Sequence, residues 1–346
     1  MCSNLWVRWD GQALTAVDPD ALPGLGEMAG LVRSVQTPEF AGITFHEVRC
    51  RSGLNRVASA ARVPFGWTIN PYRGCSHGCV YCFARNTHTY LELDAGRDFD
   101  TQIVVKINIA EVVRRELARP RWGHEHVAMG TNTDPYQRAE GRYRLMPGVI
   151  SALADSGTPF SILTKGTMLS RDLGLLGDAA TRLHVGVSIS LALLSDDLHP
   201  VLEPGTPSPR ARLALIRRIR GAGLPCGVLL APILPHLTDA TAQLEALVDE
   251  VVEAGATSVS GIALHLRPGA REWFFEWLRR ERPDLVPAYE RLYARGANAP
   301  KEYRTDLQAR LRSILSRRSL QRVERLSPPP AIPPPGPQAS EQAELF

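Results

Sequence analysis

The chain has 346 residues, of which 44% are hydrophobic and 22% charged, with a formal net charge of +4 at pH 7. A chain of this length can bury a full core, which favours one large domain with extensions over three small domains. The six cysteines form no disulfide framework, and the sequence has neither a signal peptide nor an apolar run that spans a bilayer, so we expect a cytoplasmic protein.

Residues 1–65 contain no long periodic segment, and we expect them to form an irregular extension that caps the core. Only Ile43–Val48 alternates like a short strand. We expect His46 and Cys50 to be packing or surface residues rather than metal ligands.

A dense cysteine loop follows a short apolar run at Trp67–Ile69. Cys75, Cys79 and Cys82 have the spacing C-x3-C-x2-C, so their thiolates can converge on one metal centre. The adjacent Gly74 and Gly78 would let the backbone take up positive φ and curl around that centre. The loop is therefore the predicted site of the chemistry.

The metal centre could be a zinc ion or an iron-sulfur cluster. A structural zinc site needs four protein ligands, and here no second pair of cysteines exists, although His77 could serve as a fourth ligand. A 4Fe-4S cluster bound by three thiolates keeps one iron open to a substrate or cofactor. The ligand count thus favours a catalytic cluster.

From Trp67 onward the chain alternates between strands and helices. The predicted strands are Trp67–Ile69, His126–Gly130, Phe160–Thr164, Val185–Ser190, Cys226–Ile233 and Ser258–Leu264. The predicted helices are 111–117, 146–153, 170–179, 209–222 and 241–254. Repeated βα units indicate an α/β fold with a parallel sheet, and Ile103–Ile107 is interpreted as a side strand before the second unit.

The pattern alone does not distinguish an open sheet from a barrel, but both place the functional site at the carboxyl ends of the strands. Polar residues lie at those ends. Thr131–Asp134 follow the second strand, Lys165 follows the third, and Ser188 and Ser190 lie in the fourth.

The cysteine loop, with Tyr81 just before its third cysteine, resembles the signature of the radical S-adenosylmethionine (SAM) enzymes. Asn70–Cys75, Gly130–Tyr136 and Thr164–Lys165 resemble the spore photoproduct lyase-like branch, often labelled DNA repair photolyases. The resemblance implies a partial (β/α)6 barrel over residues 66–295 and leaves the substrate unassigned.

The resemblance also implies cofactors and roles. Cys75, Cys79 and Cys82 would bind a 4Fe-4S cluster whose fourth iron takes SAM, an electron donor such as flavodoxin or ferredoxin would supply the electron, and a 5′-deoxyadenosyl radical would act on the substrate. The predicted SAM contacts are Tyr81 and Phe83 for adenine, Asn132, Thr133 and Lys165 for the methionine carboxylate, and Ser188 and Ser190 for the ribose. Asp134 would cap the following turn.

One residue departs from the branch. Thr131 occupies the place where spore photoproduct lyases have the cysteine that donates hydrogen, and a threonine O–H bond is too strong for that role. Thymine-dimer repair would need Cys226 or Tyr136 to replace it, and Cys226 is interpreted as a buried strand cysteine.

After the last predicted strand, residues 272–280 predict an aromatic-rich helix, and we expect its aromatic stripe to pack in the core. Residues 296–326 contain a predicted basic helix at 305–325, and 327–346 read as a disordered proline-rich tail. The basic helix motivates a nucleic-acid lesion lyase as one alternative function. The other alternative is a non-catalytic zinc or Fe-S binding module.

Overall fold

The computed structural model describes residues 30–58 and 63–318. In that part of the chain the main sheet has seven strands in the order β11-β10-β9-β8-β7-β4-β3. Neighbouring strands from β4 to β11 are parallel, and β3 (Leu54–Arg56) pairs antiparallel with β4. The parallel strands are β4 (Trp67–Ile69), β7 (Val127–Met129), β8 (Phe160–Thr164), β9 (Val185–Ser190), β10 (Gly227–Ile233) and β11 (Ser258–Ala263).

All six predicted parallel strands are thereby confirmed. Their order in the sheet follows their order in the sequence, as expected for consecutive βα units. The sheet is not closed, because β3 and β11 are its two edges. The fold is a mixed α/β structure of the partial-barrel kind.

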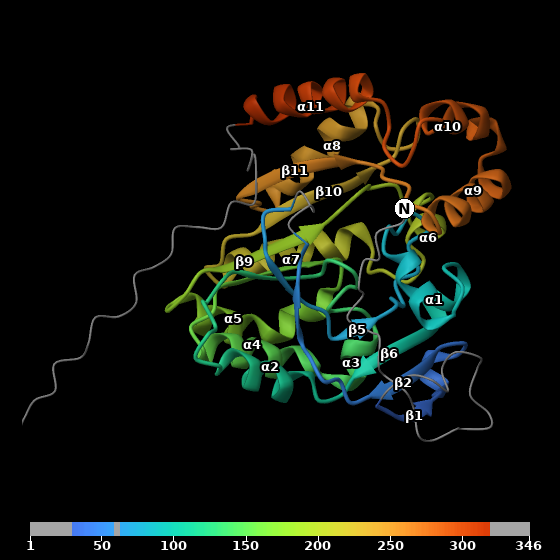
Figure 1. The fold of residues 1–346 in the computed structure, drawn as a ribbon. Helices are drawn as coiled ribbons and strands as arrows, with labels where there is room; N and C mark the ends of the chain where they lie inside the picture. Colours follow the sequence, from blue (N-terminus) through green and yellow to red (C-terminus); the bar gives the residue numbers. More distant parts are fainter. Residues whose placement is uncertain (1–29, 59–62, 319–346) are drawn as a thin grey trace, which may run out of the picture.

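Helices cover the outer face of the sheet (Figure 1). They are α2 (Ile109–Leu117), α4 (Leu145–Asp155), α5 (Leu173–Ala180), α7 (Pro209–Gly221) and α8 (Thr241–Glu253). The predicted helix 170–179 differs in detail, because its first turn belongs to the 3-10 helix η3 (Thr167–Asp172).

Strand β9 shows how the sequence separates the two faces of the sheet. Val185, Val187 and Ile189 are buried in the main core, and the alternate positions Ser188 and Ser190 point to the other face. The helices therefore pack on one face, while the other is left for polar residues.

A second sheet has four strands in the order β1-β2-β6-β5. They are β1 (Leu31–Val35), β2 (Thr44–Val48), β6 (Gln102–Lys106) and β5 (Tyr72–Arg73). The predicted side strand is β6, and it lies in this second sheet. The described part of the predicted extension consists largely of β1, β2 and β3, while residues 1–29 and 59–62 lie outside the described residues.

The C-terminal helices are α9 (Ala270–Glu281), α10 (Val286–Leu292) and α11 (Lys301–Ser316), with η4 (Pro283–Leu285) between the first two. Phe274 and Trp277 of α9 are buried, which confirms that the aromatic stripe packs in a core. Short connecting elements are η1 (Pro38–Phe40), η2 (Arg85–Leu91), α1 (Arg97–Thr101), α3 (Ala139–Tyr143) and α6 (His199–Leu202).

The basic helix α11 lies beside α8 at the β11 end of the sheet, while β1 and β2 lie at the opposite end (Figure 1). It buries Leu307, Leu311, Ile314 and Leu315. Beyond its end, Arg317 pairs with Glu245, and Arg318 pairs with Asp249, both on α8. The predicted tail 327–346 lies outside the described residues.

Within residues 30–58 and 63–318, no helix has the length and apolar character needed to cross a membrane.

Candidate active site

A cavity of about 240 Å³ opens at the carboxyl ends of the parallel strands, where the cysteine loop covers them. Nine of the ten predicted site residues line it: Cys75, Cys79, Tyr81, Cys82, Phe83, Asn132, Thr133, Lys165 and Ser190. Ser188 is not among the lining residues, because it lies two positions earlier in β9 and therefore deeper. The predicted rim of polar residues is thus one continuous site.

Backbone contacts hold the cysteine loop from several sides. The Cys75 N–H donates to the Phe99 carbonyl at 2.9 Å, and the Ser76 N–H donates to the Gln137 side chain at 2.8 Å. The Val80 N–H donates to a carbonyl of α6 at 3.0 Å. Because the loop has little regular structure of its own, these contacts fix its shape.

Arg85 ties the loop to α1. It is fully buried and donates from Nη2 to the Cys79 carbonyl at 2.9 Å and to Asp100 at 2.9 Å. Its guanidinium also lies over the rings of Phe99 and Trp273, 5.3 and 4.9 Å from their centroids. The planar guanidinium thus joins loop, helix and aromatic core.

Gly74 and Gly78 have φ values of +80° and +59°, which confirms the predicted positive φ. At Gly74 a side chain also has no room, because a Cβ would lie 2.8 Å from the His88 ring and 2.9 Å from the Phe99 carbonyl oxygen. The entry to the loop therefore requires glycine.

Burial raises the pKa of all three loop thiols, so a bound cation has to displace the proton before a thiolate can form. The chemistry of this donor set fits an iron-sulfur cluster, because three soft sulfur ligands open on one cavity. In the part of the chain that the structure describes, no three His, Cys, Asp or Glu side chains could hold a single metal ion, so the fit is to a cluster, in which each thiolate would bind a different iron.

His77, the possible fourth ligand, pairs with Asp134, whose Oδ2 lies 3.3 Å from His77 Nδ1. Asp134 also accepts from the Lys165 N–H at 2.7 Å and, as predicted for a turn cap, from the Tyr136 N–H at 2.9 Å. Burial alone would raise the pKa of Asp134, but His77 and the hydrogen bonds outweigh burial and lower it. This carboxylate joins the cysteine loop to the ends of β7 and β8.

A buried network beneath the cavity was not predicted. Glu203 is fully buried, accepts from the Tyr81 hydroxyl and pairs with Arg212. Burial alone would raise the pKa of Glu203, but Arg212 and Lys165 lower it to about 2. The sequence held one signal for the burial of Arg212. It lies four positions before Ile216 and therefore on the same, core-facing side of helix α7.

Lys165 lies between this network and the cavity. Its Nζ is 2.6 Å from the Ser190 hydroxyl and 3.9 Å from Glu203 Oε1. It also lies over the Tyr81 ring, 5.8 Å from the centroid. These three neighbouring side chains fix the position of the Lys165 ammonium group. Lys165 is still partly exposed and lines the cavity.

The remaining predicted contact residues differ in whether their side chains are already hydrogen-bonded within the protein or are exposed. The Thr133 hydroxyl donates to the Gly74 carbonyl at 2.7 Å and accepts from Gln137, so it supports the cysteine loop. Asn132 is exposed at the rim, and Phe83 is 43% exposed at the mouth of the cavity.

Thr131 lines the cavity, as expected for the position of a hydrogen donor, but neither proposed replacement does. Cys226 is buried just before β10, at the amino end of the sheet, where burial raises its pKa to about 12. Tyr136 is buried with its hydroxyl on Asp172. Cys226 is thus buried, as interpreted, although it lies one residue before the strand.

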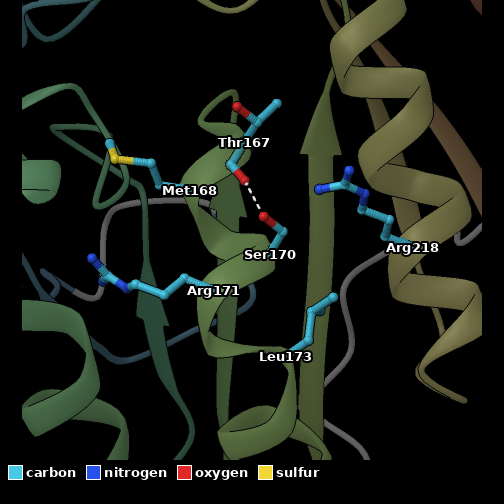
Figure 2. Close-up of a pocket in the computed structure, with 6 residues that line it drawn as sticks. All are labelled: Thr167, Met168, Ser170, Arg171, Leu173 and Arg218. Carbon is cyan, nitrogen blue, oxygen red and sulfur yellow. Dashed lines mark hydrogen bonds between the residues drawn. The ribbon is translucent and has the colours of Figure 1, made fainter.

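A wider but shallower hollow of about 590 Å³ lies on the outside of the molecule, between η3 and α7 (Figure 2). Figure 2 shows Arg218 reaching in from α7, while Arg171 points away to the other side of η3. Arg171 is already paired with Glu140 and Asp172. This hollow has none of the loop cysteines, so we place the site in the smaller cavity.

Comparisons with known proteins agree with this choice. The model of the radical SAM superfamily matches residues 69–250, which include the cysteine loop and most of the parallel strands. A Mycobacterium tuberculosis protein, described as uncharacterized, is 55% identical over 327 residues, covering 93% of this chain and 96% of that protein. An uncharacterized protein of Acidianus two-tailed virus is 29% identical over 210 residues, covering 58% of this chain and 68% of that protein.

The fold is similar to that of spore photoproduct lyase in complex with dinucleoside spore photoproduct, with a TM-score of 0.61. The similarity covers 79% of each chain at 18% identity. A variant of that lyase with bound AdoMet gives a TM-score of 0.60 at 18% identity over 78% of each chain. At 18% sequence identity, this similarity is evidence for a shared fold alone.

Proposed function

Because the chain belongs to the radical SAM superfamily, we propose that it is an enzyme that binds a 4Fe-4S cluster through Cys75, Cys79 and Cys82 and cleaves SAM reductively. When bound, these cofactors would supply a 5′-deoxyadenosyl radical that abstracts hydrogen from a substrate. The electron would come from a carrier such as flavodoxin or ferredoxin.

The observation that carries the proposal is the arrangement of the three thiols. The three thiols belong to one loop and line one cavity. Lys165, which follows strand β8, lines the same cavity. Three thiolates leave one iron of a cubane without a protein ligand. Lys165 lines the same cavity and would supply a cation for the carboxylate of a cofactor on that iron.

The other lining residues are assigned by their freedom to make contacts. We assign the methionine carboxylate to Lys165 and Asn132. The ribose is assigned to Ser190, since Ser188 lies outside the cavity; the Ser190 hydroxyl accepts from Lys165 and donates to the Ala231 carbonyl, so a ribose hydroxyl would donate to its remaining lone pair. Thr133 can contribute only through its backbone, because its hydroxyl supports the cysteine loop.

The aromatic residues are assigned in the same way. The Tyr81 ring and Phe83 are the proposed adenine contacts. The Tyr81 hydroxyl is bonded to Glu203, which fixes the orientation of its ring. Apolar side chains from β10 and the end of β11, including Leu229, Pro232 and Leu264, would keep water away from the reacting groups.

The test compares wild type with Cys75→Ala and with Cys50→Ala, a cysteine remote from the loop. After anaerobic reconstitution with iron and sulfide, dithionite and SAM should yield 5′-deoxyadenosine and methionine with wild type and Cys50→Ala. Cys75→Ala should lose at least about 100-fold of this activity, because the cluster loses one of its ligands.

Two outcomes would reject the proposal. One is a wild-type protein that holds a full cluster but does not cleave SAM. The other is a Cys75→Ala variant that cleaves SAM at the wild-type rate.

The two alternatives gain no support from the geometry. For the lesion lyase, Thr131 lines the cavity in place of a thiol, and Arg317 and Arg318, just after α11, are paired with α8. For the binding module with zinc, no group of three or more His, Cys, Asp or Glu among the described residues could hold the ion. Metal analysis separates the zinc alternative directly, since it predicts one zinc per chain and a colourless protein.

A further inference from the structure

A second cavity, of about 190 Å³, lies next to the active-site cavity. Its lining residues are Asn55, Asn70, Tyr72, Arg73, Thr87, Tyr90, Lys106 and Asn132. Asn132 lines both cavities. In addition, Asn70, which lines the second cavity, accepts a hydrogen bond of 3.5 Å from Thr131, which lines the first. A bound molecule could therefore extend from one cavity into the other.

Two cationic side chains line the second cavity. Arg73 and Lys106 line it, and none of its lining residues in the described chain is Asp or Glu. The register of the second sheet explains their proximity, because Arg73 pairs with Val104, two residues before Lys106 on the same face of β6. The two cations are therefore diagonal neighbours, about 7 Å apart by strand geometry.

Lys106 has no anionic partner of its own. Within residues 30–58 and 63–318, its Nζ forms no hydrogen bond or salt bridge. The nearby carboxylate of Glu116 is used elsewhere, because it accepts from the Ser52 hydroxyl and from the backbone N–H groups of Gly53 and Leu54 at 2.8 to 2.9 Å. A cation without a counter-ion is costly inside a protein.

The electrostatics of Lys106 agree with this picture. Burial is the main cause that lowers the pKa of Lys106; Cys50 and Glu116 oppose the change, the neighbouring Arg73 adds to it, and the resulting pKa is about 8. An anion in the cavity would offset both effects, because an opposite charge favours the charged form of a lysine. At neutral pH most of the ammonium is still charged.

Neutral donors complete the cavity. The Thr87 hydroxyl is buried and has no hydrogen-bond partner among the described residues, although it lines the cavity. Three asparagine side chains and the exposed Tyr90 lie around the same space. Cations, amides and an unused hydroxyl are together the groups that bind oxyanions.

We propose that this second cavity binds an oxyanion of the substrate, a phosphate ester or a carboxylate, while the reacting carbon of the substrate lies in front of Thr131 in the active-site cavity. This inference rests on the proposed function, because it places the substrate relative to the cluster. It assigns to the second sheet the role of presenting Arg73 and Lys106 to the substrate.

The test measures anion binding by isothermal titration calorimetry on the reconstituted full-length protein at pH 7 and constant ionic strength. Inorganic phosphate and acetate are the two probes. Phosphate binding alone would indicate a phosphate ester, and binding of acetate as well would indicate a carboxylate. Lys106→Met should weaken binding about tenfold or more, because it removes a charge-assisted hydrogen bond.

Two control variants test whether a loss of anion binding is specific to the charge at Lys106. Lys301→Met removes an exposed lysine at the start of α11 and should bind as wild type does. Lys106→Arg keeps the charge and should retain binding to within a few-fold, which excludes a general loss of folding as the cause. Lack of binding of both probes to wild type, or unchanged binding to Lys106→Met, would overturn the inference.

Failure of this inference is distinguishable from failure of the proposed function. A wild-type protein that forms 5′-deoxyadenosine but binds neither anion contradicts only the second cavity. A protein that binds phosphate through Lys106 but does not cleave SAM contradicts only the proposed radical chemistry.

Discussion

At the scale of single residues, Glu203 connects the stability of the site to its chemistry. Its carboxylate is fully buried between the Tyr81 hydroxyl and the Arg212 guanidinium, and Lys165 lies 3.9 Å away. A buried ion pair of this kind is held by its partners, and removal of one partner leaves the other charge uncompensated. The aromatic ring and the cation of the cavity both depend on this carboxylate.

We predict that Glu203→Gln lowers the free energy of unfolding by about 3–5 kcal/mol at pH 7, because it leaves Arg212 buried without its counter-ion. Urea denaturation of the cluster-free protein measures the change. Glu253→Gln is the matched control, since its exposed pair with Arg217 should contribute less than about 1 kcal/mol. Equal effects of the two variants would contradict this account of the network.

The same carboxylate predicts a dependence on pH. The pKa of Glu203 is lowered from 4.5 to about 2, so the unfolded state binds the proton more readily than the folded state. The stabilisation from ionised Glu203 is then present above about pH 4.5 and is lost as the pH falls toward 2. The difference in stability between wild type and Glu203→Gln should therefore narrow over this range, and a constant difference would contradict the assignment.

At the scale of elements, the turn after β7 depends on one glycine. Gly130 has a φ of +89°, and a Cβ at this position would lie 1.9 Å from the Leu163 carbonyl oxygen on the adjacent strand β8. Because β7 and β8 approach each other closely, Asn132 and Lys165 line the same cavity. A side chain here would force the strand ends apart.

We predict that Gly130→Ala destabilises the protein by at least about 3 kcal/mol, through the strained backbone and the contact with Leu163. Gly177→Ala is the control within helix α5, where no atom lies within 4 Å of the added Cβ. It should be neutral or stabilise by up to about 1 kcal/mol. Thermal unfolding followed by circular dichroism compares both variants, and a mild effect of Gly130→Ala would show that the turn can relax.

The elements that the sequence predicted best are those with a local pattern. β8 and β9 begin and end as predicted, because alternating apolar residues mark a strand that packs helices on one face. The two-residue strand β5 and the short helix α1 have no such period. They are set by contacts with the cysteine loop and β6, which a local pattern does not contain.

The same distinction holds for the site. The cysteines, Lys165 and Ser190 were predictable because motif spacing and strand ends place them on one rim. Glu203 was not, since its contact with Tyr81 joins positions 122 residues apart. Ser188 was predicted from the correct face of β9, but depth along a strand decides which residues reach a cavity.

At the scale of the whole molecule, the two sheets contribute to two neighbouring cavities that share Asn132. The parallel sheet supplies the cysteine cavity, and the second sheet supplies the cationic cavity beside it. Two of the three lysines in the sequence, Lys165 and Lys106, line these two cavities. We interpret these neighbouring cavities as the place where cofactor and substrate would meet.

The most direct test of this account is a crystal structure of the reconstituted protein with SAM, grown and frozen without oxygen. The account predicts iron anomalous density for a cubane bound to Cys75, Cys79 and Cys82, with the amino and carboxylate groups of SAM on the fourth iron. A fourth protein ligand on that iron, such as His77, or a single zinc ion in the loop, would contradict it.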